Sequence, residues 1–215
     1  MSHKSICAIC SDQQSNNKWL PRAINNYRED ILAQYVGEPI NHEHQLYPVF
    51  SNIAYNLQYL EYLNRCFEDL YLTSVLRAQN VKMFVLTTSQ IIECFLCVKL
   101  IEMGVHKDDI WDFVNNLRTA TAKNAFGLGP QFYRSELVWM KDLRNHIHIQ
   151  SPANIGDADY AIFENIDVLN RSKQILVYFL QRALKMPTAD MKQTFYFLGP
   201  TTEFVHSKNS HESTE

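Results

Sequence analysis

Glycine and proline are scarce in this chain of 215 residues, which contains six and seven copies of them. A β-sandwich or barrel needs a turn every few residues, and turns draw mainly on these two residue types. Their scarcity therefore argues against a fold of many short strands and favours long helices with few connections. Hydrophobic residues make up 46% of the sequence, which is enough to fill the core of one sizeable domain.

A strong excess of charge is also missing, since the formal net charge is −3 at pH 7. Any contact with nucleic acid must then come from a local patch of cations. The five cysteines are an odd number without the spacing of a disulfide framework, and the first twenty residues hold no apolar stretch long enough for a secretory signal. The most apolar run, 83–101, contains Gln90, Glu93 and Lys99, which are costly in lipid. We therefore interpret this run as a buried core helix and expect a cytoplasmic protein that does not span a membrane.

Hydrophobic spacing divides the chain into a helical centre and two polar flanks. Apolar residues recur every three or four positions, the period of helices that bury one face. We predict an all-α, antiparallel bundle of about five helices over 46–187. A polar arm with a short helix precedes it in 1–45, and an extension in 188–215 ends in a disordered tail. The expected helices cover 49–75, 81–103, the segment after Asp108-Asp109, 131–149 and 160–185. The aromatic run 194–198 either packs back on the bundle or pairs as a strand.

The expected helix over 131–149 carries the most informative polar residues. At about 100° per residue, its three cations and a histidine fall along one edge of the apolar stripe. These are Arg134, Lys141, Arg144 and His148. Arginine binds phosphate through two parallel hydrogen bonds, and histidine exchanges protons near pH 7. The row suits phosphate chemistry without a metal, with Lys141 and Arg134 as candidate substrate-binding cations. Cations near the end of a helix also complement its dipole, so a structural role stays open.

This helix ends in Leu143-Arg144-Asn145-His146-Ile147-His148, after a long helix with a buried acid and before a loop and a final long helix. The layout, over residues 49–186, resembles the HEPN superfamily (higher eukaryotes and prokaryotes nucleotide-binding). Members are small helical bundles, many of them metal-independent ribonucleases of toxin–antitoxin, phage-defence and RNA-processing systems. Their signature is an Arg, often followed by a polar residue, then a His after a gap of four to six residues. In this chain the gap is three residues.

The resemblance implies a role for each matching residue. Arg144 takes the position of the Arg that binds the scissile phosphate, and Asn145 that of the polar residue directly after it. His148 takes the position of the His that acts as acid or base. Glu93 resembles the acid that some members place on the neighbouring helix to hold the Arg.

The expected function is that of an effector that binds or cleaves RNA without a cofactor. One Arg and one His supply only part of the chemistry, so the site is expected to be completed by a second copy in a homodimer. An antitoxin or another protein is a further expected partner. The short gap leaves open both a competent nuclease and a member that binds without cutting. The alternative is a non-catalytic interaction module, in which Arg144 and Glu93 form a structural ion pair and the surface recruits a protein or nucleotide.

A zinc site is a second candidate, at the N-terminal end. Cys7 and Cys10 have zinc-knuckle spacing, and His3, or His42 with His44, are candidate further ligands. No second pair of cysteines with this spacing exists, and a loose arm with two free thiols is the favoured alternative. We therefore predict no metal as part of the main site.

Two other groups have a structural interpretation and a functional one. Cys94 and Cys97 lie in an apolar run and are interpreted as small core residues rather than nucleophiles. The first long helix also carries tyrosines that can stack on bases but more often line a helix–helix or subunit interface. They are Tyr55, Tyr59, Tyr62 and Tyr71.

Overall fold

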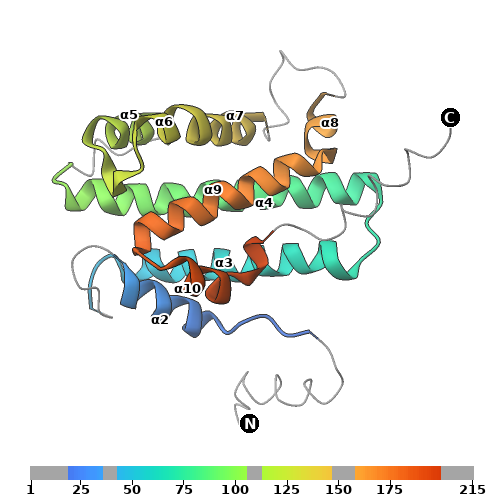
Figure 1. Ribbon diagram of the computed structural model, residues 1–215, viewed down its shortest axis with the longest axis horizontal. Coiled ribbons are helices and arrows are strands. Elements are labelled where there is room, and N and C mark those ends of the chain that lie inside the picture. The colour runs from blue at the N-terminus through green and yellow to red at the C-terminus, as the bar shows by residue number, and fades with distance from the viewer. Residues whose placement is uncertain (1–18, 36–42, 106–112, 147–157, 200–215) are drawn as a thin grey trace, which may run out of the picture.

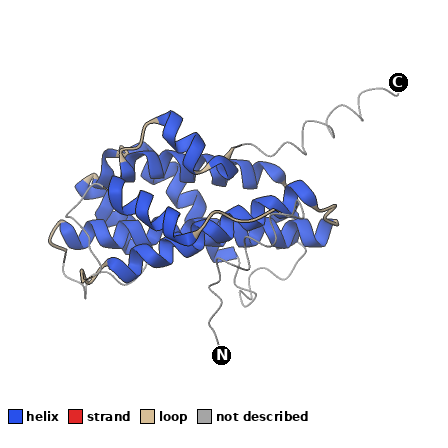
Figure 2. Ribbon diagram, turned by 90° about the horizontal axis from the view of Figure 1, so that it is seen from below, coloured by secondary structure: helices blue, strands red, loops and turns tan. Residues whose placement is uncertain are grey.

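The computed structural model describes residues 19–35, 43–105, 113–146 and 158–199. Within these ranges every regular element is helical, and the apolar faces meet in one core, as the sequence predicts (Figure 2). The long helices α4 and α9 form the middle of the bundle, between a layer with α5, α6 and α7 and a layer with α2, α3 and α10 (Figure 1). Their bounds are α2 Ile24–Gln34, α3 Tyr47–Asp69, α4 Ser74–Glu102, α5 Phe113–Lys123, α6 Pro130–Phe132, α7 Val138–His146, α9 Ile166–Leu184 and α10 Thr188–Thr194.

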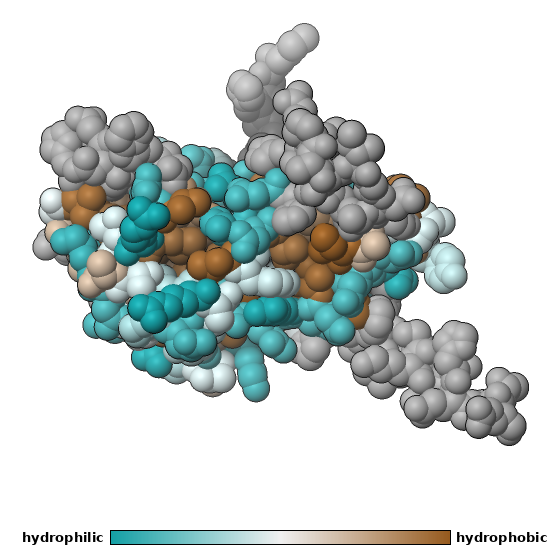
Figure 3. Space-filling model, turned by 90° about the horizontal axis from the view of Figure 1, so that it is seen from above, coloured by the Kyte–Doolittle hydropathy of each residue, from teal (hydrophilic) through white to brown (hydrophobic). Residues whose placement is uncertain are grey.

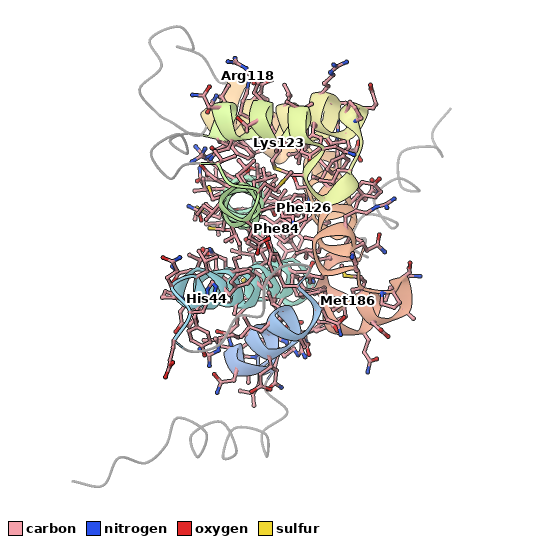
Figure 4. The ribbon with its side chains drawn as sticks, turned by 90° about the vertical axis from the view of Figure 1, so that its left-hand side faces the viewer. His44, Phe84, Arg118, Lys123, Phe126 and Met186 are labelled. Atoms are coloured by element: carbon pink, nitrogen blue, oxygen red, sulfur yellow. The ribbon has the colours of Figure 1, made fainter. Side chains whose placement is uncertain are left out.

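Helix α4 is the centre of the fold. It packs against α3, α5, α7, α8 (Ala158–Glu164) and α9, so its buried residues lie on all sides. Phe84, for example, is enclosed at the middle of the bundle in Figure 4. Among the described helices, α4 alone is long and apolar enough to cross a membrane, and most of its apolar stretch is buried inside the protein. That burial is compatible with a soluble protein and agrees with the interpretation of 83–101 as a core helix.

The first long helix is shorter than the apolar pattern predicts. The expected extent of 49–75 is wrong, because α3 ends at Asp69 and α4 begins at Ser74. Leu70 has an extended backbone, and the connection that follows it lets α4 turn back against α3. Several apolar residues that continued the pattern are exposed at this reversal, with relative exposures of 51–96%. They are Leu70, Tyr71, Val75 and Leu76.

The last long helix is divided in two, so the expected single helix over 160–185 is also wrong. Helices α8 and α9 meet at Asn165, whose backbone is extended. Its side chain accepts a hydrogen bond from the backbone N–H of Asp167, the arrangement of a helix N-cap. A capping Asn inside an apolar pattern is a local stop that the periodicity alone does not reveal.

The described parts of both flanks pack into the bundle. Helix α2 lies against α3, and the 3₁₀ turn η4 (Tyr196–Leu198) contacts α3 and α9. Residues 194–198 therefore pack back and form no strand. The buried carboxyl of Glu61 joins these segments, because it accepts hydrogen bonds from the hydroxyls of Tyr27 and Tyr196 and from the backbone N–H of Arg22. The predicted loose arm and disordered tail fall mainly on 1–18 and 200–215, outside the described residues.

A buried lysine adds a second tie on the same side of the bundle. Lys173 of α9 has a relative exposure of 1% and donates hydrogen bonds to Oδ1 of Asn64 and to the carbonyl of Gly199. Burial lowers the pKa of Lys173 to about 8, and the nearby charge of Glu68 opposes that change. The amine thus connects α9, α3 and the segment after η4.

Candidate functional site

The site helix is continuous over 130–146 but is not a regular α-helix. Gly129, with a φ of 80°, starts α6, and a π-helical turn, η3 (Tyr133–Leu137), leads into α7. Tyr133, the first residue of this turn, anchors it to the preceding segment, because its hydroxyl donates a hydrogen bond to the carbonyl of Ala125. A π turn contains more residues than an α turn, so a wheel of constant angle does not hold across it. The expected start near Gln131 agrees with this segment, and the expected end at Ile149 lies outside the described residues.

A salt bridge fixes the same segment to α9. Arg171 lies 3.0 and 3.2 Å from the two carboxyl oxygens of Glu136, and its guanidinium lies 4.2 Å from the ring centre of Trp139. The hydrogen bond from Arg171 lowers the pKa of Glu136. This bidentate pair supports the helix on the side away from α5.

Arg144 lies against the middle layer. Its Nη2 is 3.1 Å from Oε2 of Glu93 on α4, and its guanidinium carbon is 5.5 Å from the ring centre of Phe113 on α5. The side chains of Arg144 and Glu93 keep relative exposures of 29% and 23%. The guanidinium is thus positioned by a carboxylate and an aromatic ring while solvent still reaches it, an arrangement in which it can meet an anion.

The two cysteines beside Glu93 are not reactive thiols. Burial raises the pKa of Cys94, and burial together with the charge of Glu93 raises the pKa of Cys97 to about 11. The side-chain amide of Asn116 donates to Sγ of Cys97 at 3.3 Å. A protonated thiol is a poor nucleophile and metal ligand, which agrees with the interpretation that these cysteines are not nucleophiles. Both are partly buried, and Cys94 packs against the core.

Arg134 and Lys141 lie together in a separate groove between α5 and the η3–α7 segment. The groove has a volume of about 440 Å³. Its third cation is Arg118 of α5, which points away from the bundle at the outer surface in Figure 4. The other lining residues are mostly apolar: Val114, Leu117, Thr121, Ala122, Tyr133 and Val138. None of the described residues that line it is acidic.

The structure therefore divides the predicted row of cations. Arg144 contacts Glu93 on α4 and Phe113 on α5, whereas Arg134 and Lys141 line the groove. Lys141 also contacts its neighbour Asp142, with 2.7 Å between Nζ and Oδ1. Asn145 is exposed directly after Arg144.

Five of the predicted site residues lie outside the described residues: His148 and the candidate zinc ligands Cys7, Cys10, His3 and His42. Within the described ranges, no three His, Cys, Asp or Glu side chains gather as a metal site. The roles predicted for all of these residues stay predictions.

Sequence reasoning missed Arg118 and Phe113. The available signal was the spacing of Val114, Leu117, Arg118 and Thr121, which places them on one face of a helix. The sequence shows that this face carries apolar residues and a cation, but it does not show which helix lies against the face. Only the position of α7 in the structure shows that the face is one wall of a groove.

The tyrosines of α3 do not lie between helices of the part of the chain that the structure describes. Tyr55, Tyr59 and Tyr62 have relative exposures of 38–50%, and the rings of Tyr59 and Tyr62 stack with their centres 6.1 Å apart. The helix–helix part of their interpretation is wrong, and the surface-contact part stays a prediction.

Comparison with known proteins yields no matching family model, no matching curated protein and no matching solved structure. The function has to be inferred from the residues around Arg144 and the groove beside it.

Proposed function

We propose that this protein is a cytoplasmic effector of the HEPN type that binds or cleaves RNA without a metal, in a toxin–antitoxin or phage-defence setting. Arg144 binds the scissile phosphate, Asn145 positions it, and His148 acts as acid or base. The observation that supports this most directly is the guanidinium of Arg144, which is held by Glu93 and Phe113 yet remains partly exposed. A preorganised cation of this kind stabilises charge on a phosphorane without moving during the reaction.

The neighbouring cations support the same proposal. Arg134 and Lys141 follow one another along the same helical segment as Arg144 and line one groove. Phosphate contacts from such a local patch supply nucleic-acid affinity even though the whole chain carries a net charge of −3. In this proposal, Arg144 contacts the reacting phosphate and the other two contact flanking phosphates.

The proposed active form is a homodimer. A single chain offers one Arg144 and one His148, whereas cleavage of RNA needs a base, an acid and a cation. A two-fold arrangement of two copies supplies all three. A strict monomer that cleaves RNA would contradict this part of the proposal.

The test is cleavage of end-labelled RNA in EDTA by the full chain and by Arg144→Ala and His148→Ala. We expect cleavage by the parent and its loss in both variants, because each removes a different part of the chemistry. Arg182→Ala is the matched control, since Arg182 is an exposed cation on α9, away from Arg144. Cleavage that persists in both variants, or a parent that neither cleaves nor binds RNA, contradicts the proposal.

The second candidate is a non-catalytic interaction module, favoured by the ion pair between Arg144 and Glu93 itself. An exchange of the charges at positions 93 and 144 distinguishes the two candidate functions. Glu93→Arg combined with Arg144→Glu restores an ion pair but places a carboxylate where phosphate would bind. If the pair is only structural, the double variant regains the parent's stability and its binding properties. If Arg144 binds RNA, the double variant regains stability but not RNA binding.

A further inference from the structure

The groove between α5 and the η3–α7 segment combines cations with an aliphatic lining, and a surface that binds only phosphates needs the cations alone. Its cations, Arg118, Arg134 and Lys141, border a lining that is mostly aliphatic. Val114 and Val138 lie on opposite walls and keep relative exposures of 42% and 36%. Seen from above, apolar surface (brown) shows between hydrophilic side chains on the face that carries these helices (Figure 3). Exposed valines beside cations mark an interaction surface more than a solvated one.

The aliphatic lining does not suit RNA bases. Proteins hold single-stranded bases mainly by stacking them on exposed aromatic rings. Among the described residues that line this groove, Tyr133 is the one aromatic, and it has a relative exposure of 1% and donates a hydrogen bond from its hydroxyl to the carbonyl of Ala125. An aliphatic floor between two helices instead matches the apolar face of a third helix.

Charge complementarity selects the kind of helix. Arg118 and Arg134 have no acidic partner among the described residues, and no described lining residue is acidic. A partner helix that carries Asp or Glu on both sides of an apolar stripe would pair with these cations as it covers the valines. Helix α5 has 11 residues and is about 16 Å long, so the groove has room for about three turns of such a helix.

Another largely apolar groove among the described residues gives no such indication. It has a volume of about 430 Å³ and lies between α9 and the α10–η4 segment. Lys192 is the only charged residue among its described lining residues, so its charge does not identify an occupant.

We propose that the groove between α5 and α7 binds an acidic amphipathic helix of a partner protein. The apolar stripe of that helix packs on Val114, Leu117 and Val138, and its carboxylates pair with Arg118 and Arg134. Such a partner covers the two cations, Arg134 and Lys141, that flank Arg144 in the proposed RNA site. Inhibition of RNA binding by the partner rests on the proposed function, whereas binding of the helix itself does not.

The probe is a fluorescein-labelled synthetic helix of about five turns with a leucine stripe bordered by glutamates, followed by fluorescence anisotropy with the full chain. A peptide of the same composition, with its leucines spread around the helix, is the control. We expect the striped peptide to bind at least about tenfold more tightly than the control peptide. Arg118→Glu and Val138→Ser should each weaken binding of the striped peptide, about tenfold for the charge reversal. Arg182→Glu, a charge reversal on α9, should leave it unchanged.

Three outcomes overturn the proposal. Equal binding of both peptides shows attraction by charge alone, and binding that ignores both groove variants places the peptide elsewhere. If the peptide does not bind while Val138→Ser weakens binding of an RNA oligonucleotide, or converts a dimer to a monomer in light scattering, RNA or a second copy occupies the groove. If the peptide binds as expected but the parent does not bind RNA, the groove proposal stands and only the proposed function fails.

Discussion

Charged residues have opposite surroundings on the two sides of the bundle. On the α3 side, Glu61 and Lys173 are buried and enclosed by hydroxyl, amide and backbone partners that join the two flanks to the core. On the α7 side, Arg118, Arg134 and Lys141 stand at the surface around an apolar groove, and Arg144 is held in place but still exposed. Buried charge needs partners and serves the fold, whereas a cation left at the surface beside apolar residues is available to a ligand. The comparison predicts that variants on the first side change stability and variants on the second change binding.

Loss of the Glu61 carboxyl should break the α3 side most severely. Glu61→Ala leaves the hydroxyl of Tyr27, the hydroxyl of Tyr196 and the backbone N–H of Arg22 without their acceptor. We expect the free energy of unfolding to fall by about 3 kcal/mol or more, measured by urea denaturation. Glu68→Ala, on the exposed end of the same helix, should cost less than about 1 kcal/mol. Equal effects of the two substitutions would remove the distinction between enclosed and exposed charge on α3.

Lys173 predicts a pH dependence on the same side. The folded chain releases the Lys173 proton near pH 8, whereas an unfolded lysine keeps it to about pH 10.5. Between these values the unfolded state binds more protons, so this residue makes the free energy of unfolding rise with pH. We expect it to contribute about 2 kcal/mol between pH 8 and 10.

The measurement is the difference in unfolding free energy between the parent and Lys173→Met across that range of pH. Cys94 and Cys97 have raised pKa values in the fold and act in the opposite direction, because the unfolded state loses their protons first. They titrate in both proteins, so their contribution cancels in the difference. A difference in unfolding free energy that stays constant with pH would show that Lys173 keeps its proton in the folded state and that burial does not lower its pKa.

Sequence reasoning recovers the general fold because burial leaves a periodic pattern. The spacing of apolar residues identified the helical class, the central position of α4 and the start of the site helix near Gln131. The relation of Glu93 to Arg144 came from the resemblance and not from spacing, and the two side chains lie 3.1 Å apart. Periodicity records which face is buried but not where a helix stops, so it ran through the reversal at Leu70 and the cap at Asn165.

The remaining errors concern groups that meet only in three dimensions. The cations looked like one continuous row in the sequence, because only the positions of α4 and α5 show that Arg144 contacts Glu93 while Arg134 and Lys141 line a groove. The π turn at Tyr133–Leu137 also has no signature in the apolar pattern. Arg118 became a groove residue only because α5 lies against α7. Glu61 and Lys173 resemble ordinary polar residues in the sequence, since their partners are separated from them by 26 to 135 positions.

Arg144→Ala tests the α7 side of the comparison. The ion pair with Glu93 is partly exposed and screened, so we expect the free energy of unfolding to fall by only about 1 kcal/mol. RNA binding should fall, and the slope of log affinity against log salt should decrease by about one for the lost phosphate contact. Filter binding over a range of salt concentrations gives both quantities. A large loss of stability with an unchanged salt slope would show that Arg144 has a structural role and does not contact phosphate.

The smallest expected effect concerns the salt bridge between Glu136 and Arg171, a structural charge at the surface. Arg171 lowers the pKa of Glu136, so the pair stabilises the fold at pH values above the ordinary range of a glutamate and loses this contribution as the pH falls through the lowered pKa. The Arg171 side chain has a relative exposure of 42%, and solvent screening limits the contribution to less than about 1 kcal/mol. Glu136→Gln should therefore differ from the parent in stability at pH 7 and converge with it once the pH falls below the lowered pKa of Glu136. RNA and peptide binding should be the same in both proteins, since Glu136 faces α9 and not the groove. A change in RNA or peptide binding without a change in stability would show that Glu136 belongs to the binding surface and is not a structural charge.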